Sequence, residues 1–208
     1  MKTHVVQQGE HISLIAESYG FVSSDTIWMH PDNADLRALR SSPNVLFAGD
    51  ELVIPDKQQK QVECSTGALH RFVLDESEVR LRLRFLDLAR QPIPDAQAEA
   101  DFGAPDADQT DGDGLLAILV GRSERGGRVV LDRGPVDVFI GHLDPVEEET
   151  GVRGRLSNLG YLIGEIEDAD DVEELSFALE EFQADYQLAV TKEIDEATRA
   201  KLVEVHGS

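Results

Sequence analysis

The 208-residue chain contains one cysteine, Cys64, so it cannot form an intramolecular disulfide, and its cysteine content is compatible with a reducing compartment. Aromatic side chains make up only 6% of the residues, and no apolar run approaches the length of a membrane-spanning helix. Residues 1–5 lack the apolar segment that marks a secretory signal peptide. These absences predict a cytoplasmic location, unless another apparatus exports the protein, and no membrane partner.

Basic side chains are also scarce. The chain has 19 Lys and Arg residues against 41 Asp and Glu residues, for a formal net charge of -22. Residues 1–57 carry a net charge of -4, residues 58–147 carry -7, and residues 148–208 carry -11. Phosphate backbones repel so acidic a surface, so we expect no nucleic acid partner. A solvated acidic surface is the favoured interpretation, and a basic protein partner is the alternative.

The usual signatures of catalysis and metal binding are missing. The six histidines are scattered, with neither His-Glu-x-x-His nor paired-cysteine spacing, so we expect no zinc site. There is no Gly-x-Ser-x-Gly motif and no glycine-rich phosphate loop. The acidic run at residues 106–114 fits no EF-hand register, which favours a solvated turn. The sequence therefore predicts no catalytic residue, metal or cofactor, and a protein that is not an enzyme.

The first quarter of the chain alternates between strand-like and helix-like patterns. Short segments rich in Val and Ile, at the start of the chain and at residues 46–55, are bounded by Gly and Pro as strands usually are. Helical spacing between them predicts one helix over residues 13–19 and another around Trp28. The pattern predicts a β-α-α-β unit in residues 1–57, followed by a polar linker in residues 58–65.

The two strand regions of this unit, Val5-Val6-Gln7-Gln8-Gly9-Glu10-His11-Ile12 and Leu46-Phe47-Ala48-Gly49-Asp50, resemble those of the LysM module. LysM modules bind glycans that contain N-acetylglucosamine, in a shallow groove between two loops, through backbone hydrogen bonds and apolar stacking. Where the family usually has Asp-Thr after the first glycine, this chain has Glu-His. The resemblance implies a glycan groove lined by Gly9, Glu10, His11, Ile12, Asn33, Val45, Leu46, Phe47 and Ala48.

The same resemblance leaves a second interpretation open, in which the LysM fold serves as an assembly module and binds no sugar. Residues 26–33 and 42–46 are similar to a LysM subgroup associated with type VI secretion and contractile injection spikes. Trp28 follows Ile27 on a helix and is expected in the core, and His11 is expected at the surface.

Residues 66–147 are expected to form a small β-sandwich. Strict alternation at residues 80–86 is typical of a strand with one solvated face. Further strand-like segments follow at residues 96–100, 115–120, 127–131 and 136–140, with turns at residues 92–95 and 110–114. This order resembles transthyretin-like and carboxypeptidase-regulatory-like domains, which also occur on secretion spike proteins.

Residues 148–208 are expected to be helical. Helical spacing joins Leu156, Leu159, Leu162 and Ile163, and it recurs at Leu175, Leu179 and Phe182. Leu159-Gly160, Phe182-Gln183 and Asp195-x-x-Thr198 occur in the order typical of the three-helix peptidoglycan-binding domain, which implies cell-wall binding. In that family the Leu-Gly pair ends the first helix, the Phe-Gln pair ends the second, and the Asp-x-x-Thr caps the third. Residues 164–172 depart from the family's glycine-rich loop, because five carboxylates replace its glycines. This departure bears on ligand binding more than on the fold.

The sequence thus predicts a multidomain α+β chain with an N-terminal LysM unit, a transthyretin-like sandwich and a C-terminal helical domain. The predicted function is a non-catalytic accessory protein that binds peptidoglycan or a related glycan and is linked to a contractile, type VI-like secretion apparatus. The alternative is an adaptor that binds a spike, tail or effector protein without binding glycan. A cell-wall hydrolase is the least favoured reading.

Overall fold

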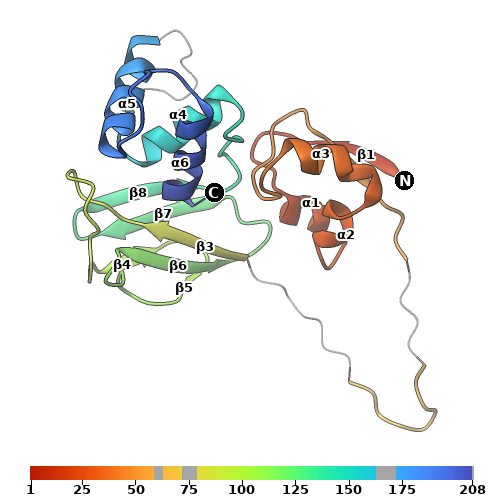
Figure 1. Cartoon of the computed structure of the whole chain (residues 1–208). Helices are drawn as coiled ribbons and strands as arrows, with labels where there is room; N and C mark the ends of the chain where they lie inside the picture. The colour runs from red at the N-terminus through yellow and green to blue at the C-terminus, as the bar shows by residue number, and fades with distance from the viewer. Residues whose placement is uncertain (59–62, 72–78, 163–171, 208) are drawn as a thin grey trace.

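The computed structural model describes residues 1–58, 63–71, 79–162 and 172–207, and their buried side chains form three separate apolar cores. One core lies in the N-terminal unit, one between two small sheets, and one among the C-terminal helices. In Figure 1 the helical unit lies above the sheets, and the N-terminal unit lies beside both. The predicted combination of small sheets and a C-terminal helical region is confirmed.

The N-terminal unit has the predicted order of strands and helices. Its two strands pair antiparallel, with Lys2 opposite Ile54 and Val5 opposite Glu51. Helix α1 buries Ile12, Ile15 and Ala16 against this ribbon, and Trp28 is buried in the same core as expected. The first strand begins earlier than the sequence pattern indicated. The elements are β1 (Lys2–Val5), α1 (Ile12–Ser18), α2 (Asp25–Trp28), the 3-10 helix η1 (Pro31–Asn33), α3 (Ala34–Leu39) and β2 (Glu51–Ile54).

The middle of the chain forms two facing three-stranded sheets, in the orders β3-β6-β5 and β4-β7-β8. Leu116, Ile118 and Val120 of one sheet and Val129 and Leu131 of the other supply much of the buried core. The sequence did not indicate β5, because a two-residue strand is too short to show alternation. The strands are β3 (Val79–Arg84), β4 (Ala98–Ala100), β5 (Ala104–Pro105), β6 (Leu115–Val120), β7 (Gly126–Leu131) and β8 (Gly134–Phe139).

The turn before β6 behaves as a solvated turn. One carboxylate oxygen of Asp111 accepts hydrogen bonds from the backbone N–H groups of Asp113 and Leu115, both at 2.9 Å. The neighbouring Thr110 is fully buried, and its hydroxyl donates to the Ile93 carbonyl at 2.7 Å while accepting from the Ala96 N–H at 3.0 Å. Thr110 and Asp111 therefore fix the turn from within the chain.

The C-terminal unit contains the three predicted helices, α4 (Glu149–Asn158), α5 (Val172–Asp185) and α6 (Glu196–His206). Helix α4 ends at Asn158 and Gly160 turns the chain with φ of 79°, so the first helix ends at the Leu159-Gly160 pair, as the family resemblance implies. Leu162 is nevertheless buried in the core beyond the helix. Ile163 and residues 164–171, on which most of the departure from the family loop falls, lie outside the described residues.

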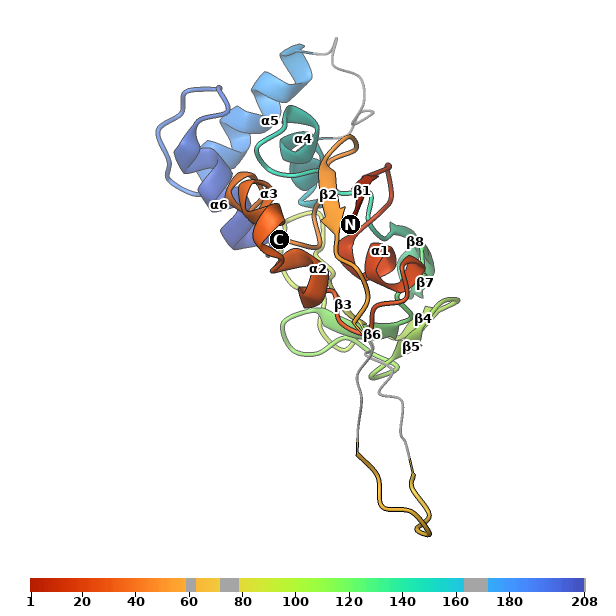
Figure 2. The ribbon, with the colours of Figure 1, turned by 90° about the vertical axis from the view of Figure 1, so that its right-hand side faces the viewer.

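Arginine side chains join the three units. From the sandwich, Arg90 donates to Glu181 at 2.8 Å and to Asp185 at 3.0 Å, and its guanidinium lies 3.7 Å from the centre of the Tyr161 ring. Arg122 donates to the carbonyls of Phe21 and Val22 in the N-terminal unit. Figure 2 shows the N-terminal unit in front of the sandwich and next to the helices. The described residues thus form one assembly of three small cores.

Candidate functional site

Most of the predicted groove residues are buried inside the N-terminal unit. Ile12 and Leu46 belong to its core. Gly9, His11, Asn33 and Val45 are also buried, whereas Glu10 and Phe47 are half-buried and Ala48 is exposed. The surface that this set offers to a ligand is therefore confined to Glu10, Phe47, Ala48 and the intervening backbone. Glycan binding by these residues stays a prediction.

Asn33 holds the N-terminal unit together. Its side-chain amide nitrogen donates to the carbonyls of Ile27 at 2.8 Å and Val53 at 2.9 Å, and its amide oxygen accepts from the Val53 N–H at 2.7 Å. The side chain is only 2% exposed. The two bonds with Val53 tie Asn33 to β2 and the bond to Ile27 ties it to α2, so this side chain serves the fold.

Glu10 is held at the mouth of the first loop. One of its carboxylate oxygens accepts from the Gln7 N–H at 2.9 Å and lies 2.7 Å from Nε2 of His4. His4 Nδ1 in turn lies 3.2 Å from the Tyr19 hydroxyl. These contacts fix the loop shape, and Gly9 supplies the positive φ of 84° that the turn requires.

The first loop also packs against the connection between β8 and α4. A Cβ atom added to Gly141 would lie 2.6 Å from the Gly9 carbonyl oxygen, and one added to Gly9 would lie 3.1 Å from Nε2 of His142. The expectation that His11 lies at the surface is wrong, because this contact leaves it 6% exposed. Burial and the nearby Arg125 lower the pKa of His11. One side of the predicted groove is therefore covered by the chain itself.

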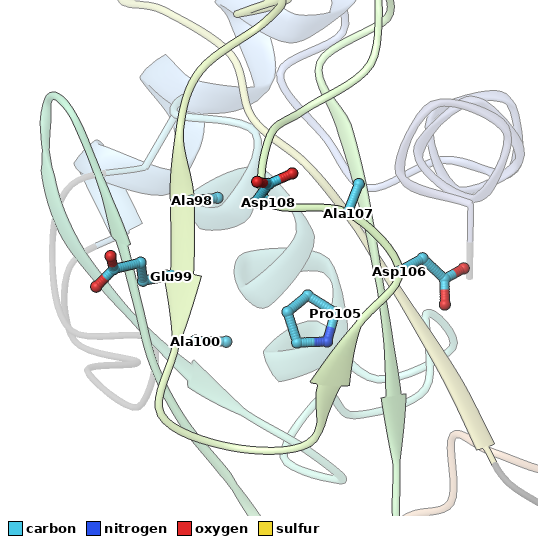
Figure 3. A pocket seen from close by; sticks show the side chains of 7 residues that line it. All are labelled: Ala98, Glu99, Ala100, Pro105, Asp106, Ala107 and Asp108. Carbon is cyan, nitrogen blue, oxygen red and sulfur yellow. The ribbon is translucent and has the colours of Figure 1, made fainter.

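A shallow hollow lies in the sandwich between β4 and the segment that leaves β5, and Figure 3 shows the residues that line it. The Glu99 and Asp106 carboxylates point to opposite sides, and Asp108 lies on the segment that leaves β5, next to Ala98. Paired carboxylates that act on one glycosidic bond must face a common substrate. The acids at this hollow do not converge in that way.

Within residues 1–58, 63–71, 79–162 and 172–207, no group of three or more His, Cys, Asp or Glu side chains is arranged to hold a metal ion. Among the same residues, no helix combines the length and apolar character needed to cross a bilayer.

Gln183 on α5 organises the loop before α6. Its side-chain nitrogen donates to Thr191 Oγ1, the Glu193 carbonyl and Thr198 Oγ1 at 2.9–3.0 Å. Its oxygen accepts from the N–H groups of Thr191 and Lys192, both at 2.9 Å. The side chain is fully buried, so the Phe-Gln signature of the sequence corresponds to a structural anchor.

Asp195 caps α6 as its spacing to Thr198 predicts. One carboxylate oxygen accepts from the Thr198 N–H at 2.8 Å and from the Thr198 hydroxyl at 2.7 Å. These hydrogen bonds, with the backbone one first, lower the pKa of Asp195. The helix ends at Gly207, which has a left-handed φ of 88°.

One exposed aromatic side chain in this unit was not singled out by the sequence analysis. Phe177 lies on α5 with 65% of its surface exposed. The core residues Leu175, Leu179 and Phe182 occupy the buried side of the same helix. Helical spacing from those residues would have placed Phe177 outside the core, and an exposed aromatic ring is suited to stacking on a sugar.

His206 makes the stability of the C-terminal unit sensitive to acid. Burial, with a contribution from Arg155, lowers the pKa of His206 to about 4, and Nε2 lies 3.0 Å from the Asn158 amide nitrogen. The ring binds a proton more readily in the unfolded protein, so protonation of His206 favours unfolding. The C-terminal unit therefore has its full stability above about pH 6.5 and loses stability as the pH falls toward 4. We expect a loss of roughly 2 kcal/mol between pH ~7 and ~4.5.

Hydrogen exchange of α4 and α6 at the two pH values, corrected for the intrinsic rate, measures this loss. The variant His206→Gln is expected to flatten the pH dependence, whereas His70→Gln, which changes an exposed histidine, is expected to retain it. An unchanged dependence in His206→Gln contradicts the assignment.

Comparison with known proteins identifies the C-terminal unit. Residues 151–202 match the family model described as "Putative peptidoglycan binding domain". No curated protein matches the chain, and no solved structure matches it. The match spans about a quarter of the chain and coincides with the three-helix unit. The C-terminal part of the chain is therefore a domain of the peptidoglycan-binding type, as its three sequence signatures predicted.

Proposed function

We propose that this protein is a non-catalytic accessory protein that binds peptidoglycan through its C-terminal unit. The family match over residues 151–202 is the observation that carries the proposal. The unit has its own apolar core, its own helix cap at Asp195 and an internal anchor at Gln183, so it presents a preformed surface. The proposal is tested by incubating the full chain with purified sacculi and measuring the protein retained.

The N-terminal unit supports two roles in this proposal. Its β-α-α-β order and loop sequences favour a LysM-type glycan contact, made by Glu10, Phe47, Ala48 and adjacent backbone. The packing of Gly9 against Gly141 and the contact of Arg40 with Glu148 favour the second role, an adaptor module held to its neighbours. Soluble N-acetylglucosamine oligomers distinguish the two roles, because only the glycan contact predicts that the sugar perturbs the loop residues.

A link to a contractile secretion apparatus is the further part of the proposal. It is motivated by the resemblance of residues 26–33 and 42–46 to spike-associated LysM proteins, and by the resemblance of residues 66–147 to transthyretin-like domains. In this setting the protein is made in the cytoplasm and reaches the wall with the apparatus. Co-purification with a spike, tail or effector protein supports the link, and reproducible isolation as a lone chain beside an intact apparatus counts against it.

Phe177 is expected to contribute to retention on sacculi. Replacing it by Ser removes an exposed ring from α5 and should reduce affinity about tenfold, the scale of one apolar side chain buried on binding. The melting temperature should stay unchanged, because the ring is not part of the core. Retention measured over a concentration series gives the affinity.

Two controls accompany this experiment. The variant Val190→Ser removes another half-exposed apolar side chain of the same unit and should leave retention close to that of the parent chain. Zymography on embedded cell wall should show no clearing. Equal retention of Phe177→Ser and the parent chain would show that the ring is not part of the binding surface. Failure of the parent chain to bind sacculi overturns the proposed function.

A further inference from the structure

Three arginines line one face of strand β3. Arg80, Arg82 and Arg84 are exposed and alternate with apolar residues that face the sandwich core. Neighbouring arginines on this face are about 6.7 Å apart, since a strand rises about 3.3–3.4 Å per residue. In a chain with a net charge of -22, the row is a local surface of opposite sign.

The edge of β3 is open among the described strands. β3 pairs with β6 and forms the end of the sheet order β3-β6-β5. The Phe85 N–H, one residue beyond β3, donates to the Gly114 carbonyl at 2.8 Å. Phe85 and every second residue before it therefore bond the strand on the β6 side. In an antiparallel pair only every second residue bonds its partner strand, so the backbone groups of Arg82 and Arg84 point away from β6.

Two of the three arginines have no partner in the part of the chain that the structure describes. Arg80 donates to Asp106, whereas Arg82 and Arg84 form no hydrogen bond or ion pair with a described residue. Their neighbours across the ladder are Ala117 and Leu115, both half-buried on the same face. The arginine stems can cover this apolar strip while both guanidinium groups remain available.

We propose that the β3 edge binds an extended acidic segment of a partner protein as an additional strand. The backbone of the segment pairs with the open N–H and C=O groups of β3, and carboxylates at alternate positions pair with Arg82 and Arg84. Charged residues at a sheet edge also prevent aggregation, and here the same charges select the partner. A second copy of β3 would set arginine against arginine, whereas an acidic strand supplies the opposite charge.

The full chain is titrated into a short fluorescent peptide of alternating Glu and Val, and anisotropy measures the affinity. The double variant Arg82→Gln/Arg84→Gln should weaken binding about tenfold, because two cross-strand charge pairs are lost. Arg71→Gln/Arg133→Gln removes the same charge from two other exposed arginines and should leave the affinity unchanged. An intact melting temperature shows that the variants are folded. Equal affinities for the two double variants overturn the proposal.

Two further probes separate strand addition from simple charge attraction. A peptide of the same composition with its glutamates clustered, and the alternating peptide methylated on alternate backbone nitrogens, should both bind much more weakly. Binding of either probe as tight as that of the parent peptide overturns the added strand. Concentration-dependent self-association abolished by Arg82→Gln/Arg84→Gln assigns the edge to a second copy and also contradicts the proposal.

Discussion

Replacing Arg40 by Met is expected to destabilise the N-terminal unit by about 3–5 kcal/mol, because the change leaves a buried carboxylate without its counter-charge. Arg40 and Asp50 are both buried, and they form two parallel hydrogen bonds of 2.9 Å each. Asp50 also accepts the Phe47 N–H at 3.0 Å, so loss of the guanidinium disturbs the loop before β2. Paired charges of this geometry are strong because both hydrogen bonds are charge-assisted.

The chain offers a local probe for this prediction. Its single tryptophan, Trp28, lies in the N-terminal core, so tryptophan fluorescence during urea unfolding follows this unit and not the other two. Because each core is separate, we expect the Trp28 transition to move to much lower urea while secondary structure in the helical unit persists.

Glu148→Gln is the matched control. Glu148 contacts the same arginine, with Arg40 Nη1 at 3.0 Å from its carboxylate, but its side chain is 37% exposed. We expect a change below about 1 kcal/mol, the usual scale of an exposed pair. The double variant Arg40→Met/Asp50→Leu should recover part of the lost stability, since neither buried charge remains. An Arg40→Met protein with an unchanged Trp28 transition contradicts the assignment.

The order of elements was predictable from the sequence wherever local chemistry specifies it. Trp28 and its neighbours follow helical spacing, the residues around Arg82 alternate as a strand does, and Asp195 caps α6 through Thr198. Each of these features depends on residues within a few positions of one another, so a single sequence carries the signal.

The contacts between units could not be predicted in this way. His11 is buried because a residue pair more than a hundred positions away, Gly141-His142, packs against its loop. Arg90 reaches Glu181 and Asp185 from a loop whose local sequence specifies only a turn. Such contacts depend on how separate cores meet, and neither periodicity nor composition encodes that. The sequence therefore predicted the residues of the candidate groove, but not the segment at Gly141-His142 that covers one side of it.

Asn33 illustrates a related limit. The resemblance to LysM modules assigned it to a glycan groove, yet its amide is committed to Ile27 and Val53. A residue type at a familiar position can serve the fold or a ligand, and only the partners of its polar atoms distinguish the two. The same criterion makes Gln183 a structural residue. Phe177 is a candidate for ligand contact on a different ground, its exposed ring.

The second large effect is expected at Gln183 in the C-terminal unit. Gln183→Leu keeps the size of the side chain but leaves the N–H groups of Thr191 and Lys192 and the hydroxyl of Thr198 without this partner. Each partly buried polar group that loses its hydrogen bond costs about 1–3 kcal/mol, so we expect a total loss of about 3–5 kcal/mol.

Hydrogen exchange followed by mass spectrometry localises this loss. Residues 186–207 should lose protection first, because Gln183 connects α5 to the loop that leads into α6, and retention on sacculi should fall with them. The Trp28 transition should stay where it is, since the N-terminal core is separate. Ala184→Leu, a change at the adjacent exposed position, serves as the control and should keep full protection.

Loss of both wall binding and local protection in Gln183→Leu, with neither lost in Ala184→Leu, would connect the peptidoglycan-binding surface to this helical unit. If the chain still binds sacculi while α6 exchanges freely, the binding surface lies elsewhere, because a surface formed by these helices is lost when they unfold.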